Sequence, residues 1–354
     1  MAVYFFYGDE EFNIELEINK FKKNLASNFA ELSGAVASKT ASFDASGVTL
    51  QYQKKGDANW TTIENDQLNI SGDNFSYKLT NLTPETSYSF RLSYNDNGNP
   101  VISNVVDFKT EKQETIYNGG FDEWWQDGPC WYPNERGKKD YWNSSNPGST
   151  SISEDYNVTT PFDMDGSKVA KLASQYVVIK FAAASLFTGK FIGLIKTIGA
   201  KLDWGIPFSS RPSALKGRLN YQPGLINRGT KPDGAPAKGE NDACQIYCVL
   251  LSEQLHVGGN ATETDNGIYY ENSTKIDWMN DNRIIAYGEI TKNENTNGWI
   301  DFTIPLVYHT TTETPQYMAI VCSANKWGDY FYGSDNTVLY VDDFSFEYGE
   351  PTVK

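Results

Sequence analysis

The residues best suited to chemistry in this sequence are aromatic side chains in loop-rich stretches. Sugar binding needs flat apolar faces that stack on pyranose C–H surfaces, with planar polar side chains nearby for the hydroxyls. The stretch NGGFDEWWQDG, at 118–128, opens a Gly-, Pro- and Asn-rich region that is dense in tryptophan. Aromatics in loops are better ligand candidates than aromatics in strands, although large aromatics also build cores. The predicted carbohydrate-binding residues are Trp125, Trp131, Trp142, Arg211, Tyr221 and Trp327.

Arg211 is the one charged residue in this set. It lies in PFSSRPSAL, between a buried-looking Phe and a Pro. A guanidinium can clamp a hydroxyl pair or a carboxylate with two parallel hydrogen bonds. It can equally tie two loops together through backbone carbonyls, and the sequence leaves both roles open.

Hydrolysis of a glycoside needs two carboxylates that face each other across a cleft, about 5 Å apart for retention and about 6.5–9.5 Å for inversion. Glu240, Asp242, Glu289 and Asp301 are the candidates, and each is interpreted as a solvated strand residue. The sequence contains no G-x-S-x-G elbow, phosphate loop or dinucleotide fingerprint. Catalysis is therefore not predicted, and a glycoside hydrolase stays as an alternative.

Composition indicates an all-β extracellular protein. The 354 residues include 22 Tyr, 19 Phe, 9 Trp and 29 Gly, which suit pleated strands and turns. The formal net charge is −15. Nucleic-acid binding needs clustered Lys and Arg, so this acidity argues against a nucleic-acid partner and against binding to anionic lipid surfaces.

The longest apolar tract is FAAASLFTGKFIGLIKTIGAKL, and Lys190, Lys196 and Lys201 interrupt it. A membrane span needs about 20 predominantly apolar residues, so no span is predicted. The N-terminus lacks a basic region and a small-residue cleavage site. We therefore expect either a soluble protein or one whose export signal is absent from this sequence.

The four cysteines are spaced unlike a metal site or a redox pair. Cys244 and Cys248 lie in one predicted strand, where four residues span roughly 13 Å, too far for a disulfide. We expect buried thiols, with one long-range disulfide involving Cys130 as the alternative.

Strand patterns divide the first third of the chain into an extension and a domain. Residues 1–24 hold one alternating segment, EEFNIELEINKF, which predicts a strand. Residues 25–112 contain short strands with turn signals every 8 to 12 residues, the rhythm of a β-sandwich. Leu82-Thr83-Pro84-Glu85-Thr86-Ser87-Tyr88 resembles the corner of fibronectin type III domains. That resemblance implies that Leu82 anchors the core and that the Tyr88 hydroxyl returns to the backbone.

Residues 116–350 predict a second, larger domain. Runs such as CQIYCVLL, RIIAYGEI and GWIDFTIPLVY read as strands, with no helical pattern longer than about two turns. So many antiparallel strands predict a two-sheet jelly roll. In NTVLYVDDFSFEY the alternation of apolar residues changes phase at the Asp pair, which predicts a bulge or bend.

An ordered set of motifs in this second domain carries a family resemblance. The set is NGGFDEW, LFTGKF, GIPFSSRPSALKGRLNY, IAYGEI, W-x-x-F-T-I-P-L-x-Y, SANKWGDYFYGSD and LYVDDFSFEY. It resembles the putative carbohydrate metabolism domain of Bacteroidetes surface proteins, in which a fibronectin-like module commonly precedes this domain. The resemblance implies the architecture and a glycan-related context.

The two ends of the second domain also resemble jelly-roll carbohydrate-binding modules that hold a structural calcium. Because Ca²⁺ takes six to eight oxygen ligands, Asp122 and Asp342 are the predicted metal ligands, with turn carbonyls near Gly119. The alternative is that these acids are surface charges at strand ends.

Together these patterns predict a glycan-binding protein, extracellular or on the outer-membrane surface, with a fibronectin type III/immunoglobulin-like sandwich before a jelly roll. We expect a lipoprotein in its full-length form, with a polysaccharide or oligosaccharide as ligand and other outer-surface proteins as possible neighbours. A structural adhesion subunit, in which the aromatics are all buried, is the second alternative.

Overall fold

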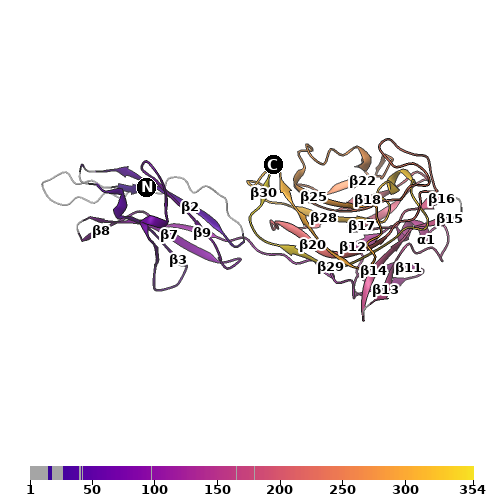
Figure 1. Cartoon of the computed structure of the whole chain (residues 1–354), viewed down its shortest axis with the longest axis horizontal. Coiled ribbons are helices and arrows are strands. Elements are labelled where there is room, and N and C mark those ends of the chain that lie inside the picture. Colours follow the sequence, from indigo (N-terminus) through magenta and orange to yellow (C-terminus); the bar gives the residue numbers. More distant parts are fainter. Residues whose placement is uncertain are drawn as a thin grey trace. The chain divides into compact units, whose positions relative to one another are not determined.

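The computed structural model describes residues 15–17, 27–39, 41, 43–96, 98–164, 166–178 and 180–354. The chain divides into two compact units (Figure 1). The first is Met1–Gln113 with Tyr348–Glu350, and the second is Glu114–Glu347 with Pro351–Lys354. The described residues of both units form strands joined by turns, which confirms the predicted all-β class.

The first unit is built from two antiparallel sheets. Its strands are β1 (Glu15–Glu17), β2 (Ala30–Ser38), β3 (Val48–Lys54), β4 (Thr61–Ile63), β5 (Asn69–Ser71), β6 (Asn74–Leu79), β7 (Ser87–Asp96), β8 (Asn99–Ile102) and β9 (Val106–Lys109). One sheet has the order β1-β2-β6-β5, and the other has β4-β3-β7-β8 with β9 also paired to β7. Alternating residues such as Leu32, Leu50 and Phe90 form a single core. Of the strand predicted near the N-terminus, β1 is the part that lies within the described residues.

The corner of this unit forms as the sequence predicts. Tyr88 Oη accepts a hydrogen bond of 3.0 Å from the backbone N–H of Thr83. Leu82 is buried in the core. The local prediction is confirmed, while the assignment of the whole module to the fibronectin type III family stays a prediction.

The second unit is a larger sandwich. Its elements are β10 (Trp125–Asp127), β11 (Cys130–Tyr132), β12 (Trp142–Ser144), α1 (Asn146–Thr150), β13 (Thr159–Met164), β14 (Ser167–Ala173), β15 (Gln175–Val177), β16 (Lys180–Ala182), β17 (Ser185–Ile195), β18 (Gly199–Trp204), β19 (Ile206–Pro207), β20 (Ala214–Gln222), β21 (Cys244–Leu251), β22 (Leu255–Val257), β23 (Glu263–Asp265), β24 (Ile268–Tyr270), β25 (Ile284–Lys292), β26 (Ile300–Pro305), β27 (Val307–Tyr308), β28 (Tyr317–Ser323), β29 (Val338–Glu347) and β30 (Thr352–Val353).

Two main sheets form this sandwich. A 10-stranded sheet runs β22-β18-β17-β28-β21-β25-β27-β30, with β12 and β19 paired at its side, and a 5-stranded sheet runs β13-β14-β29-β20-β26. The core between the sheets takes alternate residues of β21, such as Ile246 and Cys248. The other residues of β21, such as Tyr247 and Val249, join a second cluster on the outer face of the large sheet. Burial on both faces explains why this strand is almost continuously apolar.

The two ends of the second unit meet at the predicted bulge. The register between β20 and β29 shifts beside Asp342, and Asp343 has a φ of +55°. The Phe344 N–H donates to the Gly119 carbonyl over 2.8 Å. A Cβ at Gly119 would lie 2.2 Å from the Phe344 carbonyl oxygen, so glycine is required there. The predicted phase change is confirmed as a bulge.

The four cysteines are all buried and free. Burial raises the pKa of the Cys248 thiol, which keeps it protonated. The prediction of buried thiols is confirmed. Within the described part of the chain, no helix has the length and apolar character that crossing a membrane would require.

Candidate functional site

A pocket of about 280 Å³ opens on the second unit. It lies over the part of the large sheet where Ser185 and Phe187 of β17 and Ser323 of β28 face outward. The hairpins β15–β16 and β17–β18 and the region of α1 form part of its walls. The rest comes from residues 259–260 and from the 3-10 turn η4 (Gly328–Tyr330).

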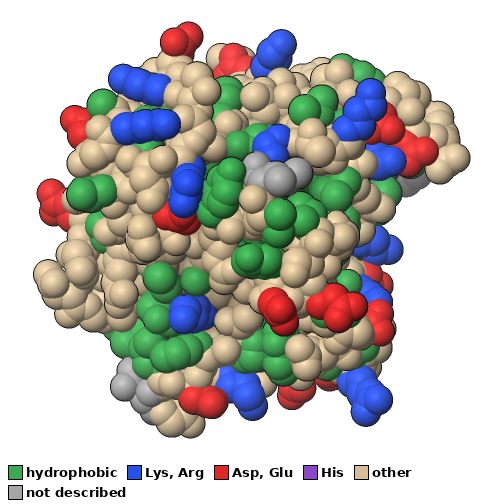
Figure 2. Space-filling view, turned by 90° about the vertical axis from the view of Figure 1, so that its right-hand side faces the viewer, with side chains coloured by type: hydrophobic (Ala, Val, Ile, Leu, Met, Phe, Trp, Pro, Cys, Tyr) green, Lys and Arg blue, Asp and Glu red, His purple; other side chains and the backbone are tan. Residues whose placement is uncertain are grey.

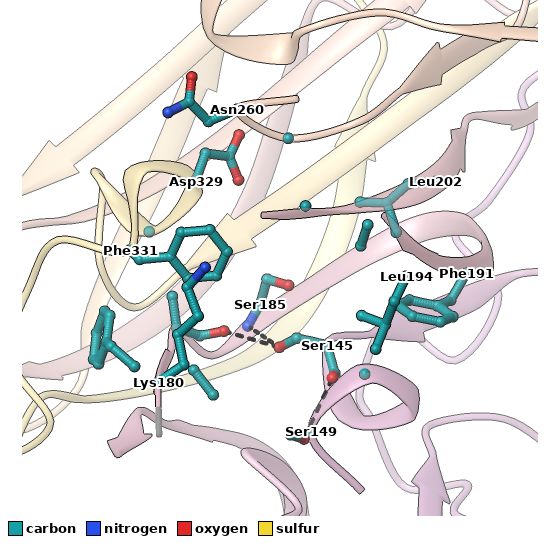
Figure 3. A pocket seen from close by; sticks show the side chains of 18 of the residues that line it. Ser145, Ser149, Lys180, Ser185, Phe191, Leu194, Leu202, Asn260, Asp329 and Phe331 are labelled. Atoms are coloured by element: carbon teal, nitrogen blue, oxygen red, sulfur yellow. Dashed lines mark hydrogen bonds between the residues drawn. The ribbon is translucent and has the colours of Figure 1, made fainter. Parts of the chain in front are cut away.

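One wall of the pocket is polar (Figure 3). The Oδ2 atom of Asp329 accepts a hydrogen bond of 2.6 Å from the hydroxyl of the buried Ser273, which fixes the carboxylate. Asn260 beside it accepts a hydrogen bond of 3.2 Å from Asn272 through its Oδ1 atom. No described residue donates to Asp329 Oδ1 or accepts from Asn260 Nδ2. This wall therefore presents one acceptor and one donor, both fixed in place, to a ligand.

The pKa of the Asp329 carboxyl is shifted by its surroundings. The residue is exposed to solvent, and the protein nearby still removes part of the hydration of its carboxyl. This desolvation raises the pKa of the Asp329 carboxyl, and the Ser273 hydrogen bond only partly opposes the rise.

Lys180 and Phe331 lie together in the same pocket. The Lys180 ammonium lies 3.6 Å from the centroid of the Phe331 ring, within range of a cation–π interaction. Lys180 also donates to the carbonyl of Thr197, and partial burial lowers its pKa. Phe331 has φ +55° and ψ +31°, a left-handed conformation that is costly for a bulky residue. Such strain persists where the surrounding structure imposes it, and it is often found at functional sites.

The opposite wall is apolar. Phe191, Leu194 and Leu202 lie together there, well apart from Asp329 and Asn260 (Figure 3). They come from the two strands of the β17–β18 hairpin. A glycine, Gly148 of α1, lets the chain approach this wall, because a Cβ there would lie 3.3 Å from a Leu194 methyl group. The pocket is thus amphipathic.

Two predicted carbohydrate-binding residues are corrected by the structure. Trp142 and Tyr221 each have an exposed fraction of 0%. The Trp142 indole donates to the Tyr117 carbonyl over 2.8 Å, and the Tyr221 hydroxyl bonds to the Ala324 carbonyl. Both predictions were wrong because these large rings fill the core between the sheets and offer no face to a sugar.

The other predicted residues are only half-buried and lie outside the pocket. Trp125 stacks on Tyr132 in the β10–β11 hairpin with ring centroids 5.6 Å apart. Trp131 lies in the same hairpin, and Trp327 packs on the small cluster around Tyr332. Arg211 donates to the Thr311 carbonyl, which favours its role as a tie between loops. Their carbohydrate roles stay predictions.

The predicted calcium ligands do not form a cation site in this geometry. Asp342 is 1% exposed, its Oδ2 lies 2.6 Å from Arg218 Nη2, and its Oδ1 accepts from the Asp343 N–H. Asp122 is exposed, and the Gly119 carbonyl is already bonded to Phe344. The described residues contain no group of three His, Cys, Asp or Glu side chains that could hold a metal. A guanidinium therefore neutralises Asp342 where the prediction places calcium.

Sequence reasoning did not identify the pocket residues. Asp329 and Phe331 lie within SANKWGDYFYGSD, where the predicted site residue is Trp327. Leu194 belongs to an apolar tract that the sequence predicts as strand and turn, and not as part of a binding site. A usable signal is the hairpin segment FIGLIKTIG, which is too apolar for an ordinary exposed turn.

Comparison with known proteins assigns the family. The sequence profile described as "Putative carbohydrate metabolism domain" matches residues 114–347, about two thirds of the chain. The chain belongs to this family. The resemblance predicted from the ordered motifs is thereby confirmed, and the membership indicates a carbohydrate-related role. No curated protein matches the chain.

Two solved structures are similar to the chain. One is a putative glycoside hydrolase from Bacteroides thetaiotaomicron, with 17% identity, 97% of this chain and 100% of that chain covered, and a TM-score of 0.49. The other is a putative glycoside hydrolase from Bacteroides vulgatus, with 18% identity, 64% and 95% covered, and a TM-score of 0.48. Both TM-scores are below 0.5.

Proposed function

We propose that the second unit binds carbohydrate in the amphipathic pocket, as part of a glycan-binding protein of the cell surface. The observation that carries the proposal is the pairing of Asp329 Oδ1 and Asn260 Nδ2, both available to a ligand, opposite a wall of apolar side chains. Sugars need planar polar groups for their hydroxyls and an apolar face for their C–H surface. Family membership supports the same ligand class.

Binding is favoured over hydrolysis by the number of carboxylates. Hydrolysis by the common mechanism needs two of them across the scissile bond. Among the described residues that line the pocket, Asp329 is the one carboxylate. A purely structural role is disfavoured because two polar atoms of the pocket, Asp329 Oδ1 and Asn260 Nδ2, bond to no described residue.

Affinity electrophoresis in gels that contain soluble polysaccharides, followed by a glycan array, tests the proposal. We expect the protein to be retained by at least one glycan, and Asp329→Asn to weaken that binding about tenfold. An amide that keeps its oxygen toward Ser273 presents an NH2 donor where Asp329 Oδ1 accepts, and a hydrogen bond lost in this way costs about 1–3 kcal/mol. Asp301→Asn is the matched control, since Asp301 is an exposed acid on β26 outside the pocket. Absence of retention by every glycan, with a folded protein, would contradict the proposal.

A further inference from the structure

The apolar wall of the pocket is more extensive than a sugar ring requires. Phe191, Leu194 and Leu202 form it, and Val177 and Ile152 from neighbouring elements continue it. Pyranose hydroxyls that were buried against such a surface would lose their hydrogen bonds to water without replacement, which costs free energy. The hydroxyls of a sugar therefore fit the polar wall, and the apolar wall fits an apolar group of the ligand.

Exposure of this wall supports the same view. Leu194 is 42% exposed and Ile152 is 46% exposed, although both line the pocket. Ile192 and Ile198 of the same hairpin are 43% and 50% exposed. The face seen in Figure 2 carries hydrophobic side chains with lysine and arginine among them. Covering aliphatic groups of this kind removes apolar area from water, which is favourable.

Side-chain type distinguishes between possible apolar occupants. Flat aromatic ligands are usually met by Trp and Tyr faces, but the described residues of this wall include neither, and its exposed side chains are Leu194 and Ile152 beside Phe191. Flexible aliphatic side chains suit an alkyl chain better than a rigid ring. Lys196, on the turn between β17 and β18, and Lys180 add positive charge to the pocket lining.

We infer that the ligand is an amphiphilic glycan, with its sugar on the wall of Asp329 and Asn260 and an aliphatic acyl or alkyl chain along Phe191, Leu194 and Leu202. This inference rests on the proposed function and specifies its substrate class. It applies to single molecules in solution as well as to glycolipids presented on a surface, since the contacts are the same.

Three probes test it by calorimetry on the full chain: methyl β-D-glucopyranoside, octyl β-D-glucopyranoside below its critical micelle concentration, and octanoate, which has the chain without the sugar. We expect the octyl glycoside to bind about tenfold or more tightly than the methyl glycoside, because its methylene groups are removed from water on the apolar wall. Leu194→Ser should reduce this preference to about threefold or less.

Leu225→Ser is the matched control, because Leu225 is 59% exposed and does not line the pocket. It should keep the full preference for the octyl glycoside. Equal binding of the methyl and octyl glycosides would overturn the inference. So would a result in which neither the octyl glycoside nor octanoate binds. If octanoate and the octyl glycoside bind equally, with loss in Leu194→Ser, the apolar subsite stands and the sugar-binding proposal fails.

Discussion

The outer face of the 10-stranded sheet has two ends that differ in what covers them. At the covered end, Trp204, Tyr247 and Tyr287 pack beneath Trp278, whose ring stacks on Tyr287 at 5.4 Å. Trp278 comes from a connection between β22 and β25 that crosses this part of the sheet. Every aromatic ring there is buried or half-buried in packing.

At the open end, no equivalent connection crosses the described part of the sheet. Phe187 lies at the bottom of the pocket, and Phe191 and Phe331 are half-buried at its sides. Both ends belong to the same sheet face and both are rich in aromatics. The difference shows that aromatic content does not identify a binding surface, whereas the segment that covers it, or leaves it open, does.

The largest effect on stability should come from removing a buried aromatic ring at the covered end. We expect Trp204→Ala to lower the free energy of unfolding by about 3–5 kcal/mol, because it removes a buried ring that packs on Tyr247 and Trp278. Urea denaturation measures this. Trp204→Phe should cost much less, since the buried indole N–H has no acceptor among the described residues. A loss of about 1 kcal/mol or less in Trp204→Ala would break the contrast between the two ends.

At the open end, a substitution that relieves the backbone should change stability little while it weakens binding. Phe331→Gly relieves the left-handed conformation at φ +55°, so the fold should lose little stability or gain up to about 1 kcal/mol. Glycan binding should weaken at the same time, because the ring that lies against Lys180 is gone. Thermal melting and affinity gels measure the two effects. A strongly destabilised variant would mean that Phe331 is a packing residue like those of the covered end.

The pH dependence of stability sharpens the comparison further. Because partial desolvation raises the pKa of Asp329 above its ordinary value of 3.8, the folded state holds this proton to higher pH than the unfolded state. Stability from this group is therefore present at low pH and is lost as pH rises from about 4 through the raised pKa. Asp329→Asn should remove that loss, so the variant should gain stability relative to wild type as pH rises from about 4 through the raised pKa. A constant difference over this range would contradict the raised pKa.

The smallest effect concerns the place where the ends of the second unit meet. Because Arg218 already neutralises Asp342, we expect the melting temperature to be the same with a chelator as with added calcium. A clear rise in melting temperature on adding calcium would support the predicted calcium site. It would also show that ligands other than Asp122 and Asp342 complete that site.

Sequence patterning determined the elements of this protein. Alternation of apolar residues predicted the strands, the corner motif predicted the hydrogen bond of Tyr88, and the phase change predicted the bulge at Asp343. Each of these depends on interactions between residues that are close in sequence or on a period of two along a strand. The family motifs added the carbohydrate context.

The tertiary structure alone decided which aromatics are accessible. Trp142 and Tyr221 are large aromatics with turn-forming residues near them in sequence, the pattern from which a binding role was predicted. In the structure they fill the space between the sheets. Asp329, Asn260 and Lys180 line one pocket although Lys180 is far from the other two in sequence. Burial depends on which distant segment crosses a sheet face, and that is set by long-range packing, which no local pattern encodes.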